Sequence, residues 1–290
     1  MIKYDPKSWF SLIFEFHKSD TFRQMFWVLL LFAGYTSLVV YAELHFSEWF
    51  TFKSTILVHS LLGFVIGLLL VFRTNTAYER WWEGRKAWGQ LVNDCRNLSL
   101  KIHAILPSQN TEQRTFFATM IGNYPSLLKD HLRNDASGND LEECAGFQKS
   151  ELDNIDHKPN FLASKLHRRI HTLHRDGEIN GDQLILIDKE LKSLTDVLGA
   201  CERIKNTPIP YSYNIFIKKF IFAYTLTMPF GLVNDFNYWA IPIATFTLYI
   251  FGSLELLAEE IEDPFGSDEN DLPTDMLAIK IRQNVKEILL

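Results

Sequence analysis

The chain has 290 residues, a net charge of −6 and three cysteines. The acidic balance argues against nucleic acid as a partner, because binding to phosphates depends on clustered basic side chains. Three widely separated cysteines cannot form a disulfide framework or a cysteine-based zinc site. The mean hydropathy of −0.04 would suit a soluble protein, but this average conceals a strongly uneven distribution of apolar residues.

Apolar residues are concentrated in four segments, which are residues 26–44, 56–72, 220–233 and 238–257. A helix needs about 20 residues to cross a hydrocarbon core of roughly 30 Å. The first and fourth segments are long enough by themselves. The second reaches this length if the turn before residue 56 is added to the helix, and the third reaches it if residues 213–219 are added. The sequence therefore predicts an all-α membrane protein with four transmembrane helices and a large helical cytosolic region.

Basic residues flank the four segments unevenly. Those before the first, after the second and before the third are Lys3, Lys7, Lys18, Arg23, Arg73, Arg80, Arg85, Lys86, Lys205, Lys218 and Lys219. The link between the first two segments has only Lys53, and the link between the last two has no Lys or Arg. By the positive-inside rule, both termini and the central region are cytoplasmic. We therefore expect a multi-pass protein of the cell inner (plasma) membrane, whose first apolar run is a retained helix rather than a signal peptide.

This order divides the chain into an N-terminal segment with two spans (1–72), a cytosolic helical region (73–212), two further spans (213–257) and an acidic cytosolic tail (258–290). Residues 73–105 are predicted to continue the second span as one helix, which Pro107 ends. Further helices are predicted at 111–132, at 161–175, which Asp176-Gly177 ends, and at 182–204, where apolar residues recur three and four apart. Pro229 and Pro242 are expected to kink the spans that contain them.

The second span carries a stripe of large apolar residues, because Phe64, Leu68 and Phe72 recur every four residues. At about 100° per residue this spacing keeps them on one slowly drifting helix face, with a rise of roughly 6 Å per step. Such a stripe can pack against other helices, or it can form the wall of a hydrophobic constriction in a pore.

His167, His171 and His174 share one face of a predicted helix, and two such histidines could bind zinc. No carboxylate or cysteine occupies a matching position, and Arg168 and Arg169 would repel a cation. A partly exposed basic face is the alternative. The sequence also lacks a Gly-rich phosphate loop, a Ser–His–Asp ordering and an HExxH motif, so we predict that the protein is not an enzyme.

Carboxylates are dense after the fourth apolar segment, on both sides of a Pro264-Phe265-Gly266 turn. They are Glu255, Glu259, Glu260, Glu262, Asp263, Asp268, Glu269 and Asp271. Oxygen ligands at short spacing around a glycine turn suit calcium, although the pattern of an EF-hand is missing. A solvated acidic cap after a membrane helix is the alternative.

Several motifs, in this order along the chain, resemble the signature of the bestrophin family. They are Arg73, Asn75, Tyr78, Arg80, Trp81, Glu83, Arg85, Trp88 and Gly89, followed by residues 198–203, 207–211 and 259–266. The later stretch 270–273 resembles the bacterial members in particular. Because the motifs are spread from about residue 60 to residue 275, the resemblance covers nearly the whole chain.

The resemblance implies a homopentameric ion channel, with one pore along the five-fold axis and a large helical cytosolic half. It also implies that the second span lines this pore, and that three large apolar residues form its neck. The matching positions are Phe64, Leu68 and Phe72, which are the residues of the periodic stripe.

A second constriction is implied at the cytosolic end of the pore, and the matching position falls near Asp182. The family usually has an apolar residue at this point. Either this chain presents a ring of carboxylates there, or the register differs and Ile179 or Leu184 is the true match.

The resemblance bears on calcium as well, since animal members bind calcium through an acidic cluster after the last span. Asp263, Asp268 and Asp271 match parts of that cluster, but Ser267 replaces an acidic ligand. We therefore expect no required cofactor, and the departure at Ser267 argues against regulation by calcium.

The implied function is the passage of monovalent ions. Many family members pass chloride, and Phe64 and Phe72 could present the positive edges of their rings to an anion. Some bacterial members are thought to prefer cations, which a ring of Asp182 carboxylates would favour. We expect a chloride-passing channel whose partners are its own copies, membrane lipid and monovalent ions. The alternatives are a sodium-selective channel and, with less support, a transporter or a membrane-anchored enzyme or scaffold. The sequence lacks the inverted repeats and mid-span charges of a transporter, and it lacks the catalytic constellation that would support the last alternative.

Overall fold

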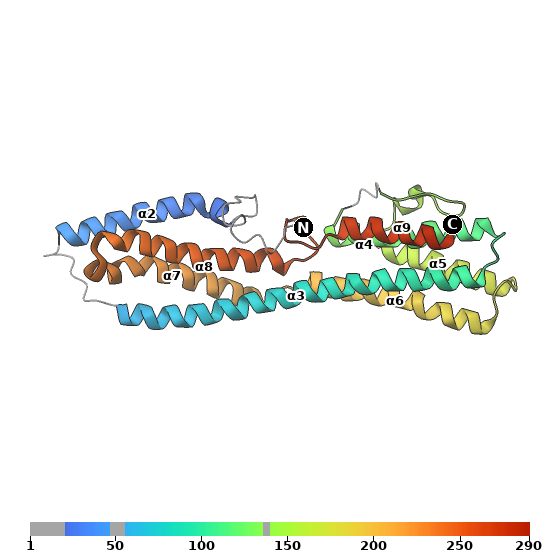
Figure 1. The fold of residues 1–290 in the computed structure, drawn as a ribbon, viewed down its shortest axis with the longest axis horizontal. Coiled ribbons are helices and arrows are strands. Elements are labelled where there is room, and N and C mark those ends of the chain that lie inside the picture. The colour runs from blue at the N-terminus through green and yellow to red at the C-terminus, as the bar shows by residue number, and fades with distance from the viewer. Residues whose placement is uncertain (1–20, 47–55, 136–139) are drawn as a thin grey trace. The chain divides into compact units, whose positions relative to one another are not determined.

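The structure, a computed structural model, describes residues 21–46, 56–135 and 140–290. This part of the chain is almost entirely helical, and no strand occurs in it beyond an isolated bridge between Cys144 and Phe147. The helices are α2 (Thr21–His45), α3 (Ile56–Ile105), α4 (Thr111–Arg133), η1 (Lys149–Leu152), α5 (Lys158–Arg175), α6 (Gly181–Asn206), α7 (Tyr211–Phe236), η2 (Asn237–Trp239), α8 (Ala240–Glu262) and α9 (Thr274–Leu289) (Figure 1). The predicted all-α class is confirmed for these residues.

The chain forms two compact units. Of the described residues, the first unit comprises 21–46, 56–80, 208–263 and 268–270, and the second comprises 81–135, 140–207, 264–267 and 271–290. The α3 helix contributes its first half to the first unit and its second half to the second unit. The basic residues Lys3, Lys7, Lys18 and Lys53, used above to predict the membrane topology, lie outside the described residues.

In the first unit, α2 and α7 both pack against α8. The core is apolar and includes Val40 of α2, Ile66 and Leu70 of α3, and Val233 of α7. Three stretches of the described chain are long and apolar enough to cross a membrane, namely Thr21–His45, Ile56–Ile105 and Tyr211–Glu262. The third stretch contains three elements, α7, η2 and α8. Since α7 packs against α8, the chain turns between them, at η2. The apolar helices support a membrane protein.

The two prolines of these helices have different positions. Pro229 lies inside α7, as predicted, with helix on both sides. Pro242 is the third residue of α8, whereas the sequence placed it inside a span. A residue in the first helical turn has no intrahelical partner for its N–H, so proline removes no hydrogen bond there. At this position Pro242 breaks no hydrogen bond of α8, so the kink predicted there lacks its physical cause.

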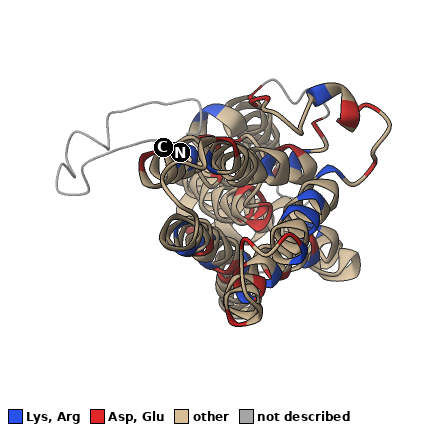
Figure 2. Cartoon of the chain, turned by 90° about the vertical axis from the view of Figure 1, so that its right-hand side faces the viewer, with Lys and Arg blue, Asp and Glu red and all other residues tan. Residues whose placement is uncertain are grey.

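In the second unit, α4 packs against α9, α5 and α6 around a large core that includes Trp88, Phe117, Tyr124 and Phe147. The three helices predicted after Pro107 are all present. The predicted helix at 161–175 starts earlier, at Lys158, because the His157 side chain caps its N-terminus. Figure 2 shows acidic and basic residues interspersed along the helices that face the viewer, which is the usual pattern of a water-exposed surface.

Candidate functional site

The central element of the candidate site is α3, an unbroken helix of 50 residues from Ile56 to Ile105. No proline interrupts it, so the apolar segment and the charged segment after Arg73 form one helix, as predicted. A Cβ at Gly63 would lie 2.8 Å from the hydroxyl of Tyr224 on α7, so a larger residue there would displace the end of that side chain. Ile66 and Leu70 of α3 belong to the core of the first unit, and this packing fixes the rotation of the helix about its axis.

That rotation exposes the predicted stripe. The exposed fractions are 71% for Phe64, 48% for Leu68 and 55% for Phe72, whereas Ile66 is fully buried and Leu70 is 1% exposed. Residues two apart point in nearly opposite directions on a helix, so the two sets occupy opposite faces. Within its own chain, the stripe therefore does not belong to the hydrophobic core.

The residue after the stripe, Arg73, is buried and faces the interior of the first unit, with an exposed fraction of 1%. Its guanidinium lies 2.7 Å from a carboxylate oxygen of Glu262 and 3.6 Å from one of Glu255, both on α8. A buried charge requires such partners. Neither the position of Arg73 after the second span nor its place in the family motif indicated that it pairs with the acidic end of α8.

Asp182 lies in the first turn of α6, after the Asn180 cap, and is exposed to solvent. The helix dipole favours a carboxylate at this position. Of the two alternatives in register, Ile179 is only 3% exposed and belongs to the core, and Leu184 is partly buried against that core. The next residue, Ile185, is 70% exposed and was not singled out from the sequence.

The acidic segment after α8 is divided between the units. Asp263 ends α8 and is exposed, as is Asp268, and both belong to the first unit. Asp271 is 2% exposed and belongs to the second unit. Calcium binding by these three carboxylates stays a prediction.

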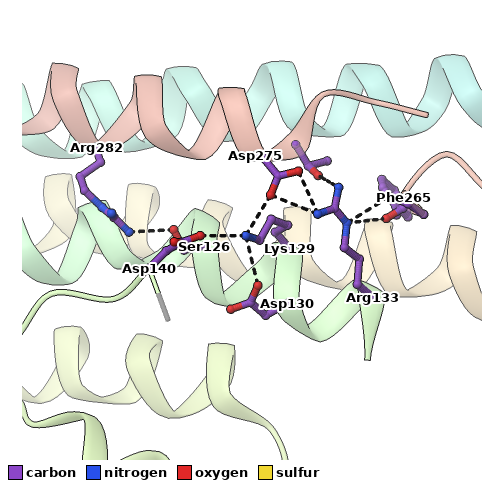
Figure 3. Close-up of polar contacts among 10 residues, drawn as sticks. Ser126, Lys129, Asp130, Arg133, Asp140, Phe265, Asp275 and Arg282 are labelled. Atoms are coloured by element: carbon purple, nitrogen blue, oxygen red, sulfur yellow. Dashed lines mark hydrogen bonds and ion pairs between the residues drawn. The ribbon is translucent and has the colours of Figure 1, made fainter. Parts of the chain in front are cut away.

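The Pro-Phe-Gly turn in this segment is held by α4. Arg133 donates hydrogen bonds from Nε to the carbonyl oxygens of Phe265, at 3.3 Å, and Gly266, at 3.0 Å (Figure 3). The Phe265 side chain is 1% exposed. The turn therefore has a structural role, in addition to the calcium site for which its glycine and flanking carboxylates were considered.

The same face of α4 carries a second cation, Lys129, which lies 3.0 Å from Asp275 of α9, 3.1 Å from Asp140 and 3.3 Å from Asp130 (Figure 3). Burial would raise the pKa of Asp275, but hydrogen bonds from Lys129 and Arg133, with their positive charges, outweigh it and hold the pKa below its ordinary value. Ionised Asp275 thus fixes α9 to α4.

The histidines singled out from the sequence do not converge. His174 places Nδ1 3.0 Å from the carbonyl oxygen of Ile179, and His167 lies 3.8 Å from Asp188 of α6. Within the described residues, the group whose ligand atoms do converge is His131, His157 and Glu202. The sequence offered no signal for this group, because its members are distant along the chain.

The comparisons with known proteins agree over most of the chain. Residues 1–287 match the family described as bacterial and fungal bestrophin proteins. A Nostoc protein named "voltage-dependent anion channel-forming protein" is 34% identical over 231 residues, which cover 77% of this chain and 74% of that protein. The Escherichia coli K12 protein of the same name, YneE, is 31% identical over 284 residues, which cover 96% of this chain and 90% of that protein.

The fold is also similar to solved structures. A crystal structure of a bacterial bestrophin homologue from Klebsiella pneumoniae superimposes with a TM-score of 0.85 at 27% identity. The superposition covers 91% of this chain and 98% of that chain. The names of these relatives are those of channels and not of enzymes.

Proposed function

Because this chain belongs to the bacterial and fungal bestrophin family, we propose that it assembles as a homopentameric channel for monovalent ions, chloride in particular. In this proposal the protein crosses the inner membrane four times with both termini in the cytoplasm. The four spans are α2, the apolar half of α3, α7 and α8. The names of its relatives, which form anion channels, support the ion class.

The observation that carries the proposal is the exposed stripe of α3. Phe64, Leu68 and Phe72 are large and apolar, yet they lie outside the core of their own chain, while Ile66 and Leu70 on the opposite face anchor the helix. One chain cannot enclose a pore with a single lining helix, so several copies must surround an axis. A stripe that faces this axis becomes a set of stacked apolar rings.

Such rings would act as a gate because an ion has to lose part of its water shell to pass them, which costs free energy. An ion loses water in a narrow apolar constriction, and no polar group of the wall replaces that water. The edges of the Phe64 and Phe72 rings carry partial positive charge, which lowers this cost for an anion relative to a cation. This difference is the physical basis for favouring chloride.

A sodium-selective channel is the second candidate, and the exposure of Asp182 favours it. Its carboxylate lies in the first turn of α6 and is free to face water. Five copies around an axis would form a ring of negative charge, which attracts cations and repels anions. A transporter or a membrane-anchored scaffold has less support, because the relatives are named as channels.

The neck is tested with two sets of substitutions on the same helix. In the first, Phe64, Leu68 and Phe72 are replaced together by alanine. In the control, Ile66 and Leu70 are replaced by alanine. Purified variants are compared for assembly by size-exclusion chromatography with light scattering, and for single-channel currents in planar bilayers.

We expect the triple variant to assemble and to show a higher conductance or open probability, since residues facing a lumen have few packing partners to lose. We expect the control to lose stability, because each large buried residue cut to alanine costs about 2–5 kcal/mol. A triple variant that fails to assemble, or that assembles with unchanged current, would contradict the assignment of the stripe as the neck.

A further inference from the structure

Three side chains from three elements of the second unit meet at one carboxylate oxygen. His131 lies in the last turn of α4, His157 caps α5, and Glu202 lies near the end of α6. Nε2 of His131 is 2.7 Å from Oε1 of Glu202, and Nε2 of His157 is 2.9 Å from the same oxygen. The two imidazole rings lie side by side, with centroids 4.5 Å apart.

The donor set suits a transition-metal ion. Two imidazole nitrogens and a carboxylate oxygen are the ligands of many zinc sites, which keep a fourth position for water or another ligand. Ligands of a tetrahedral zinc ion lie roughly 3.4 Å from one another, given bond lengths of about 2.1 Å. The two nitrogen–oxygen distances of 2.7 and 2.9 Å need to lengthen by about 0.5–0.7 Å, and all three ligand atoms already lie within 4.8 Å of one another.

The surroundings allow an ion to enter. The side chains of His131, Glu202 and His157 are 27%, 28% and 36% exposed, so the group is neither sealed in the core nor fully solvated. A cleft of about 280 Å³ opens beside His131, and the acidic residues Asp130, Asp135 and Asp156 line it together with Lys158. The excess of carboxylates in the lining favours the approach of a cation.

The hydrogen bonds of the metal-free group show what an ion would have to displace. Nδ1 of His157 accepts the N–H of Asn160 at 3.3 Å, which places the ring proton on Nε2. Zinc binds the neutral imidazole through an unprotonated nitrogen, so binding at Nε2 moves the ring proton to Nδ1, and the hydrogen bond from Asn160 is lost. At 3.3 Å this bond is long, and its loss is offset by a metal–nitrogen bond.

We propose that His131, His157 and Glu202 form a zinc site that ties the end of α4 and the start of α5 to α6. The site is separate from the pore residues proposed above, and its existence does not depend on the ion that the protein conducts. Zinc fits better than calcium or magnesium, because those hard cations prefer sites made of oxygen ligands alone.

The test uses the full-length protein in detergent, with zinc chloride as the probe. Glu202→Gln keeps the size of the side chain and removes its charge. His157→Asn removes the ligand but keeps an acceptor that can cap α5. His171→Asn is the matched control, because His171 is an exposed histidine of the same helix outside the group. Bound zinc is measured by elemental analysis after equilibrium dialysis at micromolar free zinc, and the melting temperature is measured with and without zinc.

We expect the wild-type protein and His171→Asn to bind one more zinc per chain than the two ligand variants, and to melt at a higher temperature when zinc is present. The affinity of each ligand variant should fall at least about tenfold, since changes even beyond the direct ligands cost that much. Equal binding in all four proteins would overturn the proposal. If a ligand variant fails to fold, cobalt added to the wild-type protein decides, because a His–His–Glu site gives visible absorption bands that zinc abolishes. The absence of those bands would also overturn it.

Discussion

Nη2 of Arg73 donates a hydrogen bond of 2.7 Å to Oε2 of Glu262, which joins α3 to the end of α8. The second carboxylate oxygen of Glu262, Oε1, accepts a hydrogen bond from the backbone N–H of Ile209 at 2.9 Å. The backbone carbonyl oxygen of Glu262 accepts a hydrogen bond from Nε of Arg80. One glutamate therefore holds two arginines of α3 and the turn that precedes α7. Because Arg73 directly follows Phe72, this pair sets the direction in which the stripe points.

Loss of this pair should destabilise the protein. In Arg73→Gln the Glu255 and Glu262 carboxylates lose their buried partner, and removal of one member of a buried ion pair typically costs about 3–5 kcal/mol. We expect a clear fall in the melting temperature of the detergent-solubilised protein. The matched control is Lys192→Gln, which breaks an exposed i,i+4 pair with Asp196 and should cost less than about 0.5 kcal/mol. Similar melting temperatures for both variants would mean that Arg73 does not anchor α3.

The proposed assembly predicts a definite mass. Light scattering with detergent correction should give a protein mass of about five times 33.7 kDa. A stable monomer or dimer would contradict the pore, because one or two copies of α3 cannot surround a lumen.

The choice between chloride and sodium can be tested at Asp182. Its replacement by asparagine removes one charge per chain, and a unit charge about 4 Å from an ion contributes roughly 1 kcal/mol in water, or about fivefold in an ion ratio. If Asp182 lines the pathway, the reversal potential in a sodium chloride gradient should move toward the chloride equilibrium potential. The control is Asp188→Asn on the same helix, whose side chain is 58% exposed beside His167. An identical reversal potential in the wild type and both variants would remove Asp182 from the pathway.

The attachment of α9 should depend on pH. The pKa of Asp275 lies below its ordinary value of 3.8, because Lys129 and Arg133 stabilise the ionised form. A group with a lowered pKa contributes stability above its unfolded pKa, and this contribution disappears as the pH falls through the folded pKa. We expect the wild type to melt at a higher temperature than Asp275→Asn at pH 6, and the difference to shrink below about pH 4. A difference that stays constant down to pH 3 would show that the charge of Asp275 contributes no stability.

The sequence by itself determined the helices and their approximate limits. The 50-residue α3 helix, its end before Pro107 and the apolar segments all depend on the 3.6-residue period and on the length of chain that crosses a bilayer. These are local properties, so a single sequence contains them. The same holds for the spacing of Phe64, Leu68 and Phe72, which follows from helix geometry alone.

Only the tertiary structure decided which face of α3 is buried, because Ile66 and Leu70 are as apolar as the stripe and the sequence cannot rank them. It also decided that Arg73 meets Glu262, 189 residues away, and that His131 and His157 meet Glu202. The histidines that did share a helical period, at 167, 171 and 174, do not converge. Contacts between distant residues arise from the packing of helices against one another, and that packing depends on the shapes of all the side chains between them.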